Sequence, residues 1–71
     1  MELSNDLLKL TAREVQILSM TAEGMTAKEI ADYFHISRRT VEKYREEISD
    51  KLGARCLAHA VLLGIRIGII A

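Results

Sequence analysis

Residues 26–45 read TAKEIADYFHISRRTVEKYR. Thr26 and Glu29 have the spacing of a capping box, in which the hydroxyl accepts from a backbone N–H and the carboxylate reaches back to the cap. Ser37 is a good N-cap for a second helix, and residues 35–36 form a tight break before it. The stretch therefore predicts a short helix, a turn and a longer helix.

Similar signals divide the rest of the chain. Residues 11–14 form another capping box, and the helix that they open is expected to end at Gly24, because glycine adopts the left-handed conformation that closes a helix. The longer helix is expected over residues 38–52, ended by Gly53, and a last helix over residues 57–67. No stretch shows sustained strand alternation, so the fold class is predicted to be all-α, with four helices.

Length and composition limit the class of protein. With 71 residues the chain is one domain or part of one, and a single cysteine excludes a disulfide-stabilised secreted miniprotein. The start of the chain is acidic where a signal peptide is basic, and the longest apolar stretch is too short to span a membrane. We expect a cytoplasmic protein, with residues 1–9 as a partly ordered lead-in or short helix and residues 10–71 as the domain.

The formal net charge is zero, but the charge is unevenly distributed. Residues 38–45 carry four bases and one acid, a balance of +3, whereas residues 46–52 carry three acids and one base, a balance of −2. Two capped helices joined by a short turn, the second basic at its start, have the outline of a helix-turn-helix that enters the major groove of DNA. A solvated helix face with i,i+4 ion pairs explains the charge pattern equally well.

Seven short motifs are distributed along the chain without an insertion. They are Leu10-Thr11-Ala-Arg-Glu14, Glu23-Gly24, Lys28-Glu29-Ile30-Ala31, Ile36-Ser37, Thr40-Val41, Lys51-Leu52-Gly53 and Ala60-Val61. Through them, residues 10–70 resemble the DNA-binding domain of LuxR-type regulators, the family of GerE and of NarL/FixJ. The resemblance implies that the third helix reads the major groove and that the fourth pairs two copies on an inverted repeat.

The resemblance also implies individual roles. Its base-facing positions are occupied here by Lys43, Glu42 and Glu46. Lys43 is the first choice, because lysine can donate to guanine whereas glutamate can only accept, for example from cytosine. Its positions at the DNA backbone are occupied by Lys28, Ser37, Arg38, Arg39, Thr40, Tyr44 and Arg45. Val41 is expected in the core, and Arg45 with its stem along the core edge and its head in solvent or at a phosphate.

Three features depart from the family pattern. Tyr44 stands where histidine is usual, and residues 56–57 replace a polar–arginine pair before the last helix. Glu46, Glu47 and Asp50 make the third helix more acidic than is typical. The tyrosine still offers a polar tip to phosphate, but the other two departures weaken the expected binding.

The last helix has more aliphatic residues than one small core can bury. The expected excess consists of Leu62, Leu63, Ile65, Ile67, Ile69 and Ile70. Exposed apolar surface marks an interaction site, and the resemblance implies a homodimer through Ala58, Leu62, Leu63, Ile65 and Ile67. Small residues such as Ala58 and Gly64 would allow close approach, and cover by the N-terminal leucines is the alternative.

The sequence offers little for catalysis. It has no glycine-rich phosphate loop, nucleophile motif or acid pair, and Cys56, His59 and His35 are too few for a structural zinc site. We therefore expect no enzyme, metal or cofactor, but a transcription regulator that binds double-stranded DNA as a two-fold dimer and does not bind a membrane. The alternative is a protein-interaction module of the same fold that binds a full-length regulator or RNA polymerase, which the zero net charge and the apolar last helix favour.

Overall fold

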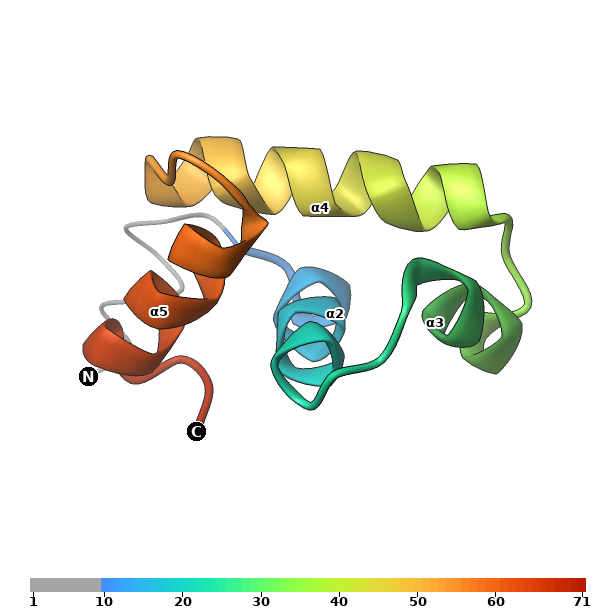
Figure 1. Cartoon of the computed structure of the whole chain (residues 1–71), viewed down its shortest axis with the longest axis horizontal. Helices are drawn as coiled ribbons and strands as arrows, with labels where there is room; N and C mark the ends of the chain where they lie inside the picture. Colours follow the sequence, from blue (N-terminus) through green and yellow to red (C-terminus); the bar gives the residue numbers. More distant parts are fainter. Residues whose placement is uncertain (1–9) are drawn as a thin grey trace.

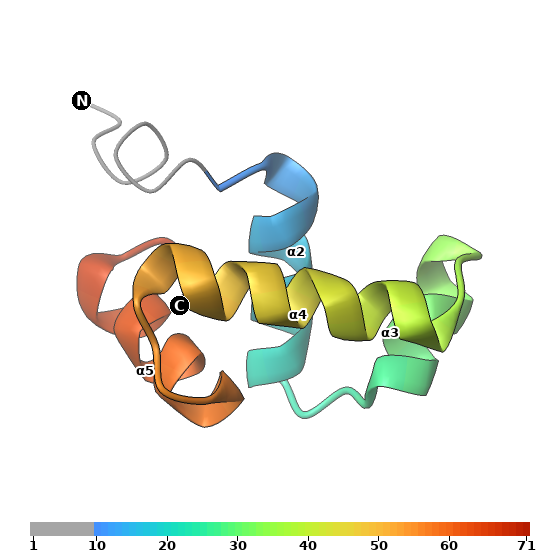
Figure 2. The ribbon, with the colours of Figure 1, turned by 90° about the horizontal axis from the view of Figure 1, so that it is seen from above.

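The computed structural model describes residues 10–71, which form helices and no strand. In chain order the helices are α2 (Ala12–Ala22), α3 (Ala27–Phe34), α4 (Arg38–Leu52) and α5 (Leu57–Ile67) (Figure 1). The longest, α4, contacts each of the other three. Figure 2 shows it crossing over α2, with α3 near its beginning and α5 near its end. The predicted all-α fold is confirmed, whereas the expected lead-in over residues 1–9 lies outside the described residues.

The helices begin and end where the local sequence predicts. Thr11 Oγ1 accepts from the N–H of Glu14 at 3.1 Å, and Glu14 Oε1 accepts from the N–H of Thr11 at 2.8 Å. Thr26 and Glu29 repeat this capping box at the start of α3. The break after α3 centres on His35, which is left-handed at φ 59°. Non-glycine residues rarely adopt that conformation, and His35 adopts it as the C-cap of α3, where the chain turns towards α4.

The core lies beneath α4. The largest fully buried side chains are Ile17, Leu18, Ile30, Ile48 and Val41. Val41 and Ile48 are both 0% exposed, and residues seven apart lie on one face of a helix. The prediction that Val41 belongs to the core is therefore confirmed, and the face of α4 opposite this pair is turned outward.

Gly64 determines how closely α5 approaches α2. A Cβ atom at this position would lie 2.9 Å from Leu18 Cδ2 and 3.3 Å from side-chain carbons of Ile70. Gly64 therefore serves packing within the domain. The expectation that Ile69 and Ile70 are exposed is wrong: Ile69 is half-buried and Ile70 is only 9% exposed. The chain turns back after α5, and both of their N–H groups donate to the carbonyl of Gly64.

An ion pair between a buried carboxylate and a partly exposed lysine joins the start of α2 to the end of α4. Lys51 Nζ donates to both carboxylate oxygens of Glu14, at 2.8 and 3.0 Å, and the Glu14 side chain is only 3% exposed. Burial by itself would raise the pKa of the Glu14 carboxyl. The hydrogen bonds from Lys51 and Thr11, together with the charge of Lys51, outweigh burial and lower this pKa below its ordinary value. The fold thus favours the ionised carboxylate.

Because the pKa of Glu14 is lower in the folded than in the unfolded state, its stabilising contribution is present above the unfolded pKa and is lost as the pH falls through the folded pKa. We expect Glu14→Gln to lower the free energy of unfolding at pH 7 by about 1–3 kcal/mol and to flatten the acid side of the stability curve. Urea unfolding between pH 7 and pH 3 measures both effects.

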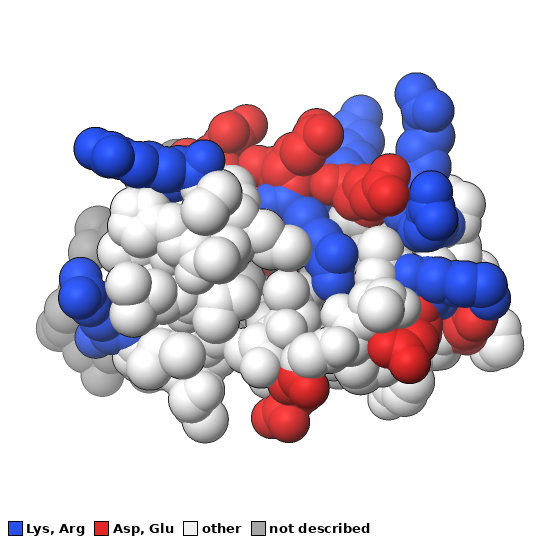
Figure 3. Space-filling model, in the orientation of Figure 1, with Lys and Arg blue, Asp and Glu red and all other residues white. Residues whose placement is uncertain are grey.

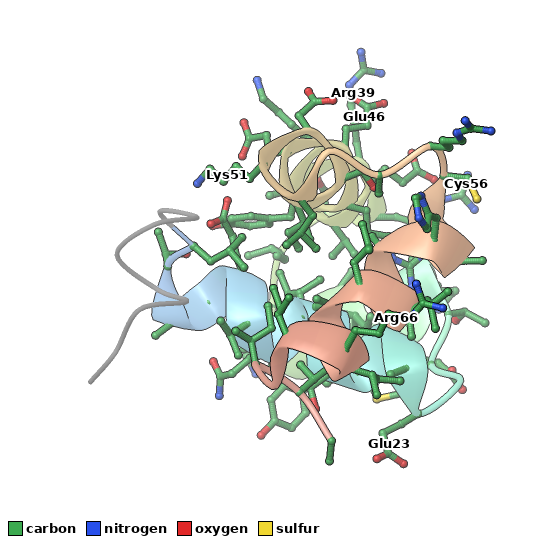
Figure 4. The ribbon with its side chains drawn as sticks, turned by 90° about the vertical axis from the view of Figure 1, so that its left-hand side faces the viewer. Glu23, Arg39, Glu46, Lys51, Cys56 and Arg66 are labelled. Carbon is green, nitrogen blue, oxygen red and sulfur yellow. The ribbon has the colours of Figure 1, made fainter. Side chains whose placement is uncertain are left out.

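Glu23→Gln is the matched control, because Glu23 projects from the other end of α2 (Figure 4). An acid-side curve that is the same in Glu14→Gln and in the parent would contradict the assignment.

Candidate nucleic-acid interface

The outward face of α4 carries a shallow hollow. Its lining residues, all exposed, are Arg39, Thr40, Glu42, Lys43 and Glu46. Arg39 and Glu46 project together away from the body of the domain (Figure 4). They share a face because two helical turns separate them, and the buried Val41 and Ile48 occupy the other face.

The hollow brings together the three predicted base-facing residues, Glu42, Lys43 and Glu46. It also includes Arg39 and Thr40, which were expected at the DNA backbone. The sequence interpretation did not place Arg39 on the base-facing stripe. Its spacing of four residues from Lys43 and seven from Glu46 is the signal that could have done so.

Two exposed ion pairs lie on the neighbouring helices α4 and α3. Arg38 Nε lies 3.4 Å from Glu42 Oε2, and Lys28 Nζ lies 3.3 Å from Asp32 Oδ2 on α3. All four side chains are more than half exposed. Exposed i,i+4 pairs of this kind are worth only about 0.3–0.5 kcal/mol, so Arg38 and Lys28 can exchange their partners for a phosphate at little cost.

The start of α4 combines hydroxyl groups with positive charge. Ser37 Oγ accepts from the N–H of Thr40 at 3.0 Å, and the two hydroxyl oxygens lie 2.8 Å apart. The N-terminus of a helix carries a partial positive charge. Figure 3 shows basic side chains gathered at the end of the molecule where α4 begins and α3 lies, with acidic side chains both at this end and farther along α4. The first turns of α4 thus combine a helix N-terminus with basic side chains.

Arg45 has a different environment from the expected one. Its Nε donates to Thr21 Oγ1 at 3.2 Å, and its Nη2 donates to the carbonyl of Met25 at 3.0 Å. The side chain is half-buried, and burial lowers its pKa, partly offset by the charge of Glu42. The head that was expected in solvent or at a phosphate is therefore held within the domain.

Tyr44 lies at the edge of the interface. It is half-buried and packs against the core, and a second hollow on α4 is lined by Thr40, Lys43, Tyr44 and Glu47. The ring of Tyr44 thus contributes to the core. The second hollow shares Thr40 and Lys43 with the first, so the two hollows adjoin.

An aromatic contact fixes α3 against α2. The guanidinium of Arg13 lies over the ring of Phe34, 4.3 Å from its centroid. The ring of Tyr33 packs edge-on against the same ring, with 5.0 Å between the two centroids. Cation–π contacts of this kind stabilise by about 0.5–2 kcal/mol. The contact holds the end of α3, and with it the helix that carries Lys28.

On the other side of the molecule, α5 exposes apolar residues. Leu62, Ile65 and Ile67 are 43%, 46% and 45% exposed, Ala58 is exposed and Leu63 is half-buried. Figure 3 shows an uncharged area over α5.

Other features of the described residues do not add a site. The N-cap of α5 is Cys56, which makes no side-chain cap hydrogen bond, and His59 Nδ1 accepts from the N–H of Arg55, just before the helix, at 3.0 Å. Within residues 10–71, no group of three or more His, Cys, Asp or Glu side chains could hold a metal ion. No helix in this part of the chain is long and apolar enough to cross a membrane.

Comparison with known proteins places this geometry in a family. Residues 8–63 match the family model GerE, described as bacterial regulatory proteins of the luxR family. The chain belongs to this family. The solved structure of the transcription factor GerE resembles this LuxR-family domain with a TM-score of 0.84, at 29% sequence identity, covering 87% of this chain and 92% of that chain.

Longer relatives contain this LuxR-family domain as one part. The chain is 48% identical over 58 residues to the methanol utilization control regulatory protein MoxX of Paracoccus denitrificans, and the matched region covers 82% of this chain and 26% of that protein. It is 35% identical over 68 residues to the transcriptional regulatory protein LnrK of Bacillus subtilis, and the matched region covers 96% of this chain and 31% of that protein. The chain thus spans about a quarter to a third of the length of these two relatives.

The cap at Ser37 gives a testable consequence for the start of α4. Ser37→Ala removes the acceptor of the Thr40 N–H, so we expect the free energy of unfolding to fall by about 1 kcal/mol and the Tm by about 4–8 °C. Ser37→Thr keeps a hydroxyl acceptor and should retain most of the stability. Thermal melts followed by circular dichroism measure the difference, and an equal loss in both variants would show that the cap is not the cause.

Proposed function

We propose that this LuxR-family domain is the DNA-binding part of a bacterial transcription regulator, acts in the cytoplasm without a cofactor, and reads double-stranded DNA with the outward face of α4. The supporting observation is the division of α4 into two faces. Val41 and Ile48 are fully buried, while the five residues that line the hollow are exposed on the other side. A helix with such an outward polar face fits the major groove, where base edges offer distinct donors and acceptors.

In this proposal Lys43 reads a base directly, and Glu42 and Glu46 select or reject bases beside it. Lysine donates to guanine, whereas a glutamate accepts from cytosine. The contacts to the DNA backbone come from Lys28, Ser37, Arg38, Arg39, Thr40 and Tyr44. Arg45 is left out of this set, because two of its donors bind Thr21 and Met25 within the domain.

The proposed assembly is a two-fold homodimer through α5. Leu62, Ile65 and Ile67 are each more than two-fifths exposed, and Ala58 and Leu63 border them. Two copies related by such an axis would place their recognition helices in major grooves about 34–36 Å apart. The target site is then an inverted repeat.

The second candidate function is a protein-interaction module of the same fold. The apolar face of α5 and the zero net charge of the chain favour it, because neither attracts DNA. Its partner would be a full-length regulator or RNA polymerase, bound through α5.

Selection of the domain's targets from random duplex DNA, at low and at near-physiological salt, decides between these functions. We expect an inverted-repeat motif at both salt concentrations, because base contacts survive the screening that weakens phosphate contacts. Binding that disappears with added salt and yields no motif would contradict DNA reading and favour the interaction module.

The two proposed lysine roles predict different losses on the selected duplex. Lys43→Ala should relax the preference at one base pair and weaken specific binding by about 1–3 kcal/mol, whereas Lys28→Ala should weaken all sequences alike and reduce the slope of log K against log salt by about one. Each variant serves as the control for the other in titrations at several salt concentrations. A changed base preference in Lys28→Ala would show that the roles are assigned wrongly.

Sedimentation equilibrium tests the dimer. We expect a weak homodimer that DNA strengthens and that Ile65→Asp abolishes, because a charge at the centre of the apolar face would be desolvated on association. Tyr33→Ser removes an exposed large hydrophobic from α3 instead and should leave the association constant unchanged. A monomeric mass of the parent at high concentration, with and without DNA, would contradict the proposal.

A further inference from the structure

We infer that Arg45 is a positioning residue for DNA recognition: by binding Thr21 and Met25, its guanidinium fixes the phosphate-binding helix α3 relative to the base-reading face of α4. The inference rests on the proposed function. It concerns a residue on the recognition helix that acts through the domain and does not touch the DNA.

The geometry joins three elements at one point. Arg45 lies on α4, Thr21 is near the end of α2, and Met25 lies in the turn that leads into α3. Arg45 Nε donates to Thr21 Oγ1 at 3.2 Å, and Arg45 Nη2 donates to the Met25 carbonyl at 3.0 Å. These partners lie 24 and 20 residues away in the sequence, so the contacts depend on the tertiary fold.

The hydroxyl of Thr21 is well prepared for this contact. It donates to the carbonyl of Ile17 at 2.8 Å, which leaves its lone pairs for Arg45. The hydroxyl therefore has one donor and one acceptor contact, both satisfied. A fixed hydroxyl of this kind holds the plane of the guanidinium, because the N–H donors of arginine form a rigid fork.

The second contact reaches α3 through its first residues. Met25 directly precedes Thr26, the N-cap of α3, and Lys28 lies in the first turn of that helix. Restraining the Met25 carbonyl therefore restrains the start of α3. On the same helix as Arg45, Lys43 and Glu42 face outward. The guanidinium thus sets the distance between Lys28, the proposed contact to the DNA backbone, and the proposed base-reading residues on α4. These two sets of contacts must engage the duplex at the same time.

A direct phosphate contact by Arg45 is the competing role. The half-buried side chain already uses two of its five N–H donors within the domain, through Nε and Nη2, so a phosphate contact would have to use the remaining three. The two roles differ in one measurable way. Loss of a phosphate contact reduces the slope of log K against log salt by about 0.9. Loss of a positioning contact leaves the number of phosphate contacts, and therefore this slope, unchanged.

The test compares Thr21→Val, Thr21→Ser, Arg45→Met and the double variant Thr21→Val/Arg45→Met with the parent chain. Equilibrium binding is measured on the selected duplex and on a scrambled duplex at several salt concentrations. Ser19→Ala is the matched control, because it removes a hydroxyl from α2 that makes neither of the two contacts of Arg45. Thermal melts establish that each variant is folded at the assay temperature.

We expect Thr21→Val and Arg45→Met each to weaken binding to the selected duplex by roughly 10-fold, the effect of one charge-assisted hydrogen bond, with an unchanged salt slope and little effect on the scrambled duplex. The double variant should lose no more than Arg45→Met alone, because the two residues share one contact. Thr21→Ser should restore most of the affinity. These results would support the positioning role, and Thr21→Val alone carries the test if Arg45→Met does not fold.

Three results would overturn the inference. A parent-like affinity of Thr21→Val would show that the contact does not matter for recognition. A salt slope that falls by about one in Arg45→Met would show a direct phosphate contact. Unchanged hydrogen exchange of the Met25 amide, which donates to the Met20 carbonyl, in Arg45→Met without DNA would show that Arg45 does not restrain the turn. A parent that binds the selected and scrambled duplexes equally would instead refute the proposed function, and the recognition role of Arg45 with it.

Discussion

The buried stripe of α4 is the constraint on which the rest of the structure depends. Val41 and Ile48 have no exposed surface, and α2, α3 and α5 all pack against the helix that carries them (Figure 2). Rotating α4 about its axis would expose both side chains, at a cost of about 1.5–3 kcal/mol each. The outward direction of Arg39, Lys43 and Glu46 is therefore determined by the core and needs no contact of their own.

The chain has zero net charge, but its charged residues fall into two groups: some make contacts within the domain, and others remain exposed. Glu14 and Glu29 cap helices, and Lys51 and Arg45 form contacts inside the domain. Arg38, Arg39 and Lys43 remain on the first turns of α4, all exposed. Net charge describes the field at long range, whereas a recognition surface depends on the charges that the fold leaves outward.

The opposite end of the molecule shows how one small residue separates an inner from an outer surface. Gly64 lets α5 approach Leu18 closely, and Ile70 folds back over it. With the inner face of α5 closed in this way, Leu62, Ile65 and Ile67 lie outside the core. An exposed apolar face of this kind is typical of interaction surfaces, and here it lies on a different helix from the hollow on α4.

The sequence by itself determined the helices, because the signals that begin and end them act over three or four residues. The boxes at Thr11 and Thr26 and the cap at Ser37 follow from such local spacing, whereas the grouping of Glu42, Lys43 and Glu46 came from the resemblance to the LuxR-type family. Only the tertiary structure decided that Arg45 binds Thr21 and Met25. It also decided that Lys51 forms an ion pair with Glu14, 37 residues away, and that Ile70 is buried. These contacts join residues far apart in the chain, and their partners are chosen by how the helices pack, which no local periodicity specifies.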